Sequence, residues 1–335
     1  MKRLFVKLAT ALAYFLGIDA LFYHLNSHAK RIITFHNVLP AKLFKADLTN
    51  AVSMSDKDFR LVVCEIAKRF NFSTDLDDAS TVTLSFDDGY LNQYEVAARI
   101  LKDMGNIPAI VFVAGNLIGN NDPVKALTVD KLLHWLVYAP NGEYSLFGHK
   151  FTLNGSTRND VWDDPIRPAY AADVATKGES ILRELDAQHP FSSILATLPQ
   201  DYKRLRLTGM SAKEIEDLRS RGWKIGWHTH SHYPLASLGH DEKVNEITPP
   251  DGFGNVPFSY PYGGMSLVDD ESVAIASSCG YPCAVSNVCG DVDAPAHSLF
   301  FLPRLPLPAD KYRLHFILSG AEHFIRHWRL LPVIS

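Results

Sequence analysis

The chain has 335 residues, 47% of them hydrophobic, so it can bury a sizeable core in one large domain or two smaller ones. Its 33 lysines and arginines against 37 aspartates and glutamates give a formal net charge of -4, which excludes the basic footprint of a nucleic-acid-binding protein. The charged fraction of 21% is ordinary, and no low-complexity tract is present.

The N-terminal segment is first basic and then apolar. Lys2 and Arg3 precede the apolar run 8–18, which has the length of a signal-peptide core but no convincing cleavage site after it. The run is too short to cross a bilayer in the usual way. Its large residues recur at helical spacing, which predicts an N-terminal amphipathic helix within residues 1–29, lying on the domain or on a membrane surface. An uncleaved membrane anchor is the alternative.

Strands and helices alternate along the rest of the chain. Apolar runs predict strands at 31–36, 81–86, 108–115, 224–228, 256–260, 283–286 and 301–305. Helical periodicity or capping signatures predict helices at 55–70, 92–104, 211–222, 269–278 and 312–328. The alternation breaks down from 116 to about 208, where helices are predicted at 127–137 and 173–185 and a hairpin at 144–153.

This pattern predicts an α/β fold with a parallel sheet or barrel. About seven strands can be counted, one short of a regular eight-stranded barrel, so we expect a distorted (β/α)7-type barrel. Residues 30–335 form this domain, and 116–208 are an insertion at one edge, where specificity is often built.

Chemically reactive side chains stand at the C-terminal ends of these strands. His36, Asp87, Asp88, His228 and Tyr262 each follow an apolar run. Active sites of β/α barrels are built at that edge of the sheet, so we expect these residues to converge.

The adjacent carboxylates of Asp87 and Asp88 repel each other unless a cation or a proton offsets their charge. A turn that caps the next helix is the plainer alternative. A metal site is favoured by His228, His230 and His232, three imidazoles within five residues. Two imidazoles and one carboxylate with open positions form a standard catalytic metal site, beside which Asp87 could stay ionised and take a proton from water.

Ser-Phe-Asp-Asp-Gly at 85–89 and His-Thr-His-Ser-His at 228–232 resemble the first two motifs of the polysaccharide deacetylases, the NodB-like carbohydrate esterases of family 4. The resemblance covers roughly residues 30–115 and 210–305 and implies the NodB homology fold. It makes Asp87 the general base, and Asp88, His228 and His232 the ligands of a divalent metal ion. That ion is zinc, with cobalt or nickel as alternatives, and His230 falls at a variable position.

The third motif of the family, R-x-P-[YF], corresponds to residues 259–262. By resemblance, Tyr262 lines the site, and its backbone N–H helps to stabilise the oxyanion. Ser259 replaces the arginine that usually braces the base. Arg304, at the end of the last strand, could supply that charge from another direction; a surface ion pair is the alternative.

The last motif of the family carries a histidine that protonates the leaving amine, and the sequence does not place it. His36, at a strand end, is the better-positioned candidate, although it lies in the wrong part of the chain for that motif. His315, His323 and His327 belong to the predicted terminal helix.

The resemblance implies a metal-dependent hydrolase acting on carbon–nitrogen bonds other than peptide bonds. A metal-activated water, with Asp87 as base, removes acetyl groups from N-acetylated sugars of a glycan, a glycan precursor or a sugar-lipid, and acetate is released. A non-catalytic metal- and glycan-binding member and an O-acetyl esterase are the alternatives. A glycosidase is disfavoured because neighbouring acids such as Asp87 and Asp88 cannot readily flank a glycosidic bond.

The insertion and the segment 302–306 are most similar to the branch associated with exopolysaccharide and cell-surface glycan synthesis. The four cysteines are expected to be reduced core residues, which favours the cytoplasm. We therefore expect a cytoplasmic protein at the inner face of the membrane, with peripheral membrane contact through the N-terminal helix; a membrane-anchored or exported protein is the alternative.

Overall fold

A computed structural model describes residues 2–76, 78–253, 255–264, 266–287 and 299–331. Its centre is a curled parallel sheet. The strands of this sheet are β1 (Arg31–Phe35), β4 (Asn71–Phe72), β5 (Thr81–Phe86), β6 (Ile110–Val113), β9 (Lys224–Trp227), β10 (Phe258–Ser259), β11 (Ala284–Val285) and β12 (Leu305–Pro306). Seven follow the order β11-β10-β9-β6-β5-β1-β12, and β4 pairs with β5. These seven are the predicted strands, most of them shorter than expected.

The two ends of the sheet approach each other. Val285 in β11 forms a parallel bridge with Leu302, just before β12. The N–H of Ser286 donates to the carbonyl of Leu302 at 2.8 Å. The sheet is therefore a distorted barrel joined through an irregular segment, which confirms the predicted fold class.

The core of the barrel is built from apolar strands covered on both faces, as parallel strands require. Every residue of β1 and β6 is buried. Aromatic rings tie the sheet to a covering helix: the ring centroid of Phe59, in the helix Asp56–Ala67, is 5.1 Å from that of Phe35 and 5.8 Å from that of Phe86. This rigid core fixes the strand ends at which the reactive residues stand.

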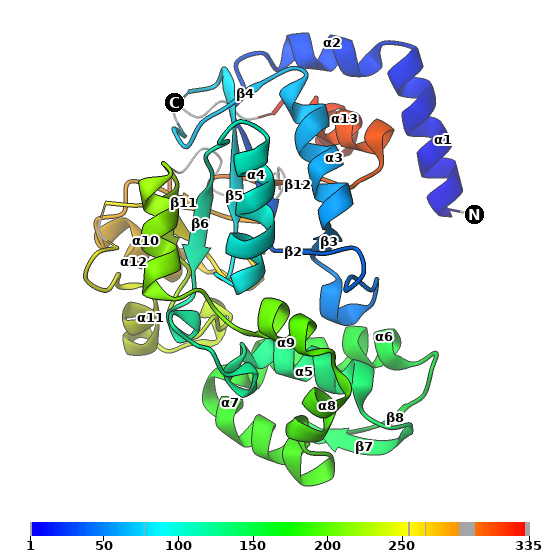
Figure 1. The fold of residues 1–335 in the computed structure, drawn as a ribbon, viewed down its shortest axis with the longest axis vertical. Coiled ribbons are helices and arrows are strands. Elements are labelled where there is room, and N and C mark those ends of the chain that lie inside the picture. Colours follow the sequence, from blue (N-terminus) through cyan, green and yellow to red (C-terminus); the bar gives the residue numbers. More distant parts are fainter. Residues whose placement is uncertain (1, 77, 254, 265, 288–298, 332–335) are drawn as a thin grey trace.

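Helices surround the sheet (Figure 1). They are α3 (Asp56–Ala67), α4 (Arg99–Asp103), α10 (Ala212–Ser220), α11 (His240–Ile247), α12 (Asp270–Ser278), α13 (Lys311–Leu318) and α14 (Ala321–His327). The predicted capping box at the start of α10 is present, with the Ser211 and Glu214 side chains each bonded to the other's backbone. Helix α11 was not predicted, and a π-helical turn, Gln93–Ala98, forms the first half of the helix predicted at 92–104.

The insertion lies beyond the C-terminal edge of the sheet (Figure 1). It contains α5 (Thr128–Tyr138), β7 (Gly142–Leu146), β8 (His149–Leu153), α6 (Arg158–Val161), α7 (Arg167–Gln188), α8 (Phe191–Thr197) and α9 (Gln200–Leu207). The predicted hairpin and both predicted helices are present, whereas α6, α8 and α9 were not predicted. Most members of one hydrophobic cluster, including the buried Trp135, come from this region. A separate short sheet pairs β2 (Asn37–Leu39) with β3 (Ser53–Ser55).

Both terminal segments differ from the single helices predicted for them. The first is broken into α1 (Lys2–Phe15) and α2 (Ile18–Leu25) at Gly17, which has a φ of 75°. The last is broken into α13 and α14 at Gly320, which has a φ of 89°. Glycine adopts this left-handed conformation without a side-chain clash, so the apolar period continues while the axis turns.

No single helix of the described residues is long and apolar enough to cross a membrane. Residues 4–15 of α1 together with α2 pass that test by length and composition, but the two helices meet at 71°.

The prediction of core cysteines is wrong for Cys64, which is exposed, and correct for Cys283, which is buried; Cys279 is half-buried. Cys289 lies outside the described residues.

Candidate active site

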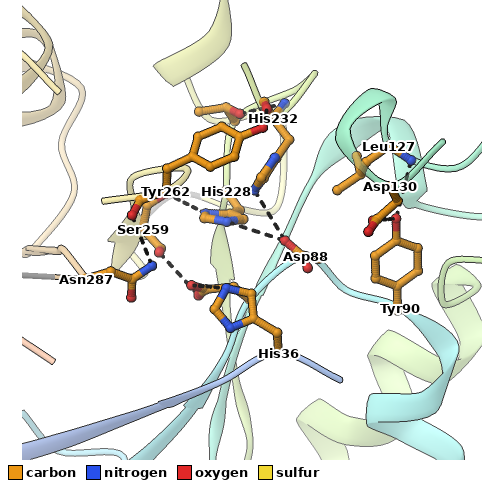
Figure 2. Close-up of polar contacts among 12 residues, drawn as sticks. His36, Asp88, Tyr90, Leu127, Asp130, His228, His232, Ser259, Tyr262 and Asn287 are labelled. Carbon is orange, nitrogen blue, oxygen red and sulfur yellow. Dashed lines mark hydrogen bonds and ion pairs between the residues drawn. The ribbon is translucent and has the colours of Figure 1, made fainter. Parts of the chain in front are cut away.

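The five reactive residues predicted to converge do so at the C-terminal edge of the sheet. Asp87 and Asp88 follow β5, His228 follows β9, and His36 follows β1. Tyr262 comes shortly after β10 and lies close to both His228 and His232 (Figure 2). The strand ends therefore bring acids and imidazoles from distant parts of the chain into one cluster.

Asp88, His228 and His232 form a buried group that could hold a metal ion. One ligand atom from each lies within 4.8 Å of the others. Asp88 Oδ1 is 3.7 Å from His228 Nε2 and 3.3 Å from His232 Nε2 (Figure 2). Burial raises the pKa of Asp88 to about 7 and lowers the pKa of His228 to about 3. Both shifts reflect the cost of burying a charge.

The donor set fits a divalent ion. His228 Nδ1 lies 2.7 Å from the backbone carbonyl of Ser259 and donates to it, so the lone pair of Nε2 faces Asp88. Within the described part of the chain, Asp88 Oδ1 and His228 Nε2 are buried without a hydrogen-bond partner. A buried polar atom without a partner costs about 1–3 kcal/mol, which coordination would offset. His230 is exposed and lies outside the group, as the resemblance implies.

Backbone strain is concentrated at this site. Eight non-glycine residues of the described chain have a positive φ, and four of them are Asp88, Thr229, His232 and Tyr262. A β-branched residue such as Thr229 is a marked outlier in that conformation. The Thr229 hydroxyl accepts a hydrogen bond from the His232 N–H at 3.0 Å, which holds the loop. Strain of this kind persists where the surroundings impose it, and it gathers at functional sites.

Asp87 is paired with Arg304. The guanidinium donates to both carboxylate oxygens, Nη1 to Oδ1 at 2.7 Å and Nη2 to Oδ2 at 2.6 Å, and both side chains are fully buried. The alternative of a surface ion pair is therefore wrong. The Ser259 hydroxyl also donates to Asp87, at 3.2 Å. Burial alone would raise the pKa of Asp87, but the Arg304 charge outweighs it and holds that pKa well below its usual range.

His36 and Tyr262 complete the surroundings. His36 Nε2 is 3.7 Å from Asp87 Oδ2. The Tyr262 hydroxyl lies 3.0 Å from that of Tyr170 in the insertion, and its ring centroid is 4.8 Å from that of His232. The histidines of the last two helices are elsewhere: His315 contacts Tyr23 and Glu65, and neither it nor His323 nor His327 lines the cleft described below.

A cleft of about 700 Å³ opens onto these residues. One wall comes from the insertion and another from the segments 44–54 and 306–309. Its lining includes His36, Asp88, His232 and Tyr262.

Three polar residues of the cleft were not predicted. The side-chain oxygen of Asn287 accepts a hydrogen bond from Arg304 Nη2 at 2.7 Å. Asp130 and Arg206 form a buried ion pair at 2.5 Å, and Tyr90 donates to Asp130 (Figure 2). No short motif marks these residues: Asn287 follows β11, and Asp130 and Arg206 come to the cleft through the packing of the insertion on the barrel.

No family model and no curated protein matches the sequence. Solved structures match the fold. The Streptococcus pyogenes deacetylase PplD, solved in complex with acetate, aligns with a TM-score of 0.51 at 14% identity, over 86% of this chain and 98% of that chain.

Two further structures align less closely. IcaB from Ammonifex degensii gives a TM-score of 0.47 at 14% identity, over 88% of this chain and 96% of its own. The polysaccharide deacetylase BC0361 from Bacillus cereus gives a TM-score of 0.48 at 12% identity, over 86% of this chain and 68% of its own. The chain therefore has the fold of PplD.

Proposed function

We propose that this chain is a metal-dependent polysaccharide deacetylase that releases acetate from N-acetylated sugars of a glycan or glycan precursor. The observation that carries the proposal is the buried Asp87–Arg304 pair beside the Asp88, His228 and His232 group, of which Asp88 and His232 line an open cleft. The shared fold of PplD, which was solved with acetate, supports it. Release of acetate from N-acetylated oligosaccharides is the test.

Asp88, His228 and His232 would hold the divalent ion, which is zinc, with cobalt or nickel as alternatives. When bound, this ion supplies Lewis acidity to the attacking water and to the acetyl carbonyl. Asp87, kept ionised by Arg304, takes a proton from the water as its oxygen attacks the carbonyl carbon. Because Asp87 and Asp88 are adjacent in the chain, the base would stand beside the ion that Asp88 helps to hold, and the ion would raise the acidity of the water.

The remaining steps fall to His36 and Tyr262. The Tyr262 backbone N–H donates to the developing oxyanion. His36, facing the cleft next to Asp87, donates a proton to the sugar nitrogen as the carbon–nitrogen bond breaks, leaving acetate and a free amine. A member that only binds is the alternative, because Ser259 replaces the usual arginine and the sequence does not place the general acid. The Arg304 guanidinium against Asp87 supports the catalytic interpretation over this alternative, as does His36 beside Asp87.

The His36→Gln variant tests the proton donor. We expect kcat for an N-acetylated oligosaccharide to fall about a hundredfold, because an amine leaves only after protonation. Hydrolysis of an aryl acetate should fall far less, since a phenolate leaves without help. His230→Gln, at an exposed neighbouring histidine, is the control and should keep both activities. Equal losses on the two substrates would show that His36 does not donate the proton.

The His228→Ala variant tests the metal group. The purified wild-type chain should bind about one zinc ion, and the variant should bind it more than about a hundredfold more weakly, because one of three protein ligands is lost. His230→Ala should bind zinc like the wild type. Equilibrium dialysis with zinc analysis measures both. Unchanged zinc affinity in His228→Ala would contradict the proposed ligand set.

A further inference from the structure

Helix α1 presents its large apolar side chains to solvent and its small ones to the domain. Thr10 and Ala13 are buried, and the Tyr14 ring packs on Tyr312 of α13 with centroids 5.3 Å apart. The outward residues of α1, and Leu16 directly after it, are between 61% and 73% exposed: Leu4, Phe5, Leu8, Leu12, Phe15 and Leu16. A helix stabilised by its own domain alone would show the reverse arrangement. The outer face of α1 therefore fits an apolar medium outside the molecule.

Apolar side chains are also exposed on α2 and the C-terminal segment. Leu21 and Leu25 of α2 are 55% and 46% exposed. Phe22 of α2 packs on Phe324 of α14 with ring centroids 5.1 Å apart, and Trp328, 80% exposed, packs on Phe324 at 5.8 Å. An exposed tryptophan beside aliphatic side chains is typical of a surface at the membrane–water boundary.

The sequence of α1 is basic. The sequence of α1 contains Lys2, Arg3 and Lys7 and no acidic residue. The one acid of α2, Asp19, is buried, with Arg69 at 3.9 Å. An apolar helix whose sequence carries basic residues and no acid is complementary to the anionic headgroups of a lipid leaflet.

The geometry favours a helix pair that lies on the bilayer rather than one that crosses it. α1 and α2 meet at 71°, and α1 packs along α13 instead of projecting from the domain (Figure 1). We propose that α1 and α2 dock this chain on an anionic lipid bilayer, with their outer face in the headgroup region and the domain above it. This docking goes beyond the proposed function.

The proposed docking surface lies next to the cleft. Lys7 Nζ is 3.8 Å from Asp310 Oδ2, and the preceding residues Pro308 and Ala309 line the cleft. That wall is apolar and includes Met54 and Leu307. A docked chain would thus hold the mouth of its cleft near the lipid, within reach of a sugar attached to a lipid anchor, a consequence that rests on the proposed function.

Sedimentation with lipid vesicles tests the docking without any assay of activity. The full chain is mixed with vesicles of phosphatidylcholine, alone or with about 30% phosphatidylglycerol. The test variant carries Leu8→Glu and Leu12→Glu on the exposed face of α1. The control carries Leu61→Glu and Val124→Glu, at apolar side chains that are 42% and 48% exposed elsewhere. Thermal unfolding of each variant checks that the fold is intact.

We expect the wild type and the control to bind the anionic vesicles, more weakly in about 0.5 M salt, and the α1 variant to bind at least about tenfold more weakly. Equal binding by the α1 variant would overturn the proposal. So would a wild type that binds no vesicles but forms a dimer that the α1 variant cannot form, because a second copy would then cover this face. Vesicle-bound chain that resists alkaline carbonate would overturn it in favour of a membrane span.

Discussion

Asp87→Asn is expected to lower kcat for acetate release about a thousandfold, while zinc affinity stays within about threefold of the wild type. The substitution keeps the size of the side chain and removes its ability to accept a proton. Zinc binding should survive because Asp88, His228 and His232 are unchanged, and Asp87 is not a member of the ligand group. Steady-state kinetics and equilibrium dialysis on the same preparation measure the two effects.

The control is Asp201→Asn, an identical chemical change at an exposed position in the insertion, which should leave kcat unchanged. Two results would contradict the role of Asp87. One is turnover within tenfold of the wild type, which would mean that another group takes the proton. The other is loss of zinc together with activity, which would make Asp87 a part of the metal site.

Arg304→Met is expected to be the most destabilising single change at this site, by about 3–5 kcal/mol at neutral pH. It leaves the buried carboxylate of Asp87 without its partner, in a position where neither side chain contacts solvent. Activity should fall as well. Arg304→Lys keeps the charge but loses the paired hydrogen bonds. Its free energy of unfolding should therefore lie between those of the wild type and Arg304→Met. Urea unfolding followed by circular dichroism gives the free energies.

The double variant Arg304→Met with Asp87→Asn separates the effect of the unpaired Asp87 charge from that of the lost Arg304 packing. Removing both charges should restore most of the stability lost in Arg304→Met alone, since the uncompensated carboxylate is gone. If the double variant is as unstable as Arg304→Met, lost packing and not the unpaired charge is the cause.

The pH dependence of this pair has a defined sign. The pKa of Asp87 in the folded chain lies below its ordinary value, so its stabilising contribution is present at neutral pH and is lost as the pH falls through the folded-state pKa. In Arg304→Met the folded-state pKa of Asp87 should instead rise, and the carboxyl can then take up a proton in mild acid. The stability difference between variant and wild type should therefore shrink between neutral pH and about pH 4.

The strand-end residues could be predicted because their signal is local. The run Thr81–Phe86 is apolar, suits a pleated surface and stops on Asp87 and Asp88, so one stretch of sequence contains both the strand and its reactive end. The same holds for His228 after β9. Parallel strands then place these ends at one edge without any further information.

The groups that join the site from a distance could not be predicted in this way. Arg304 could be suggested only as one of two alternatives, because its contact with Asp87 depends on the curl of the sheet, in which β12 pairs with β1 and β1 pairs with β5. Asp130 and Arg206 reach the cleft only through the packing of the insertion. The breaks at Gly17 and Gly320 were missed because the apolar period runs on across both glycines.

Acetate release with the metal removed and then restored is the most direct test of the proposed function. The chain is stripped with a chelator and assayed on N-acetylated oligosaccharides of several sugars and lengths, before and after zinc or cobalt is added back. We expect release from at least one oligosaccharide, its loss after stripping, and its return with the metal. Release that persists at the full rate in the stripped chain, with no zinc detectable, would contradict a metal-dependent deacetylase.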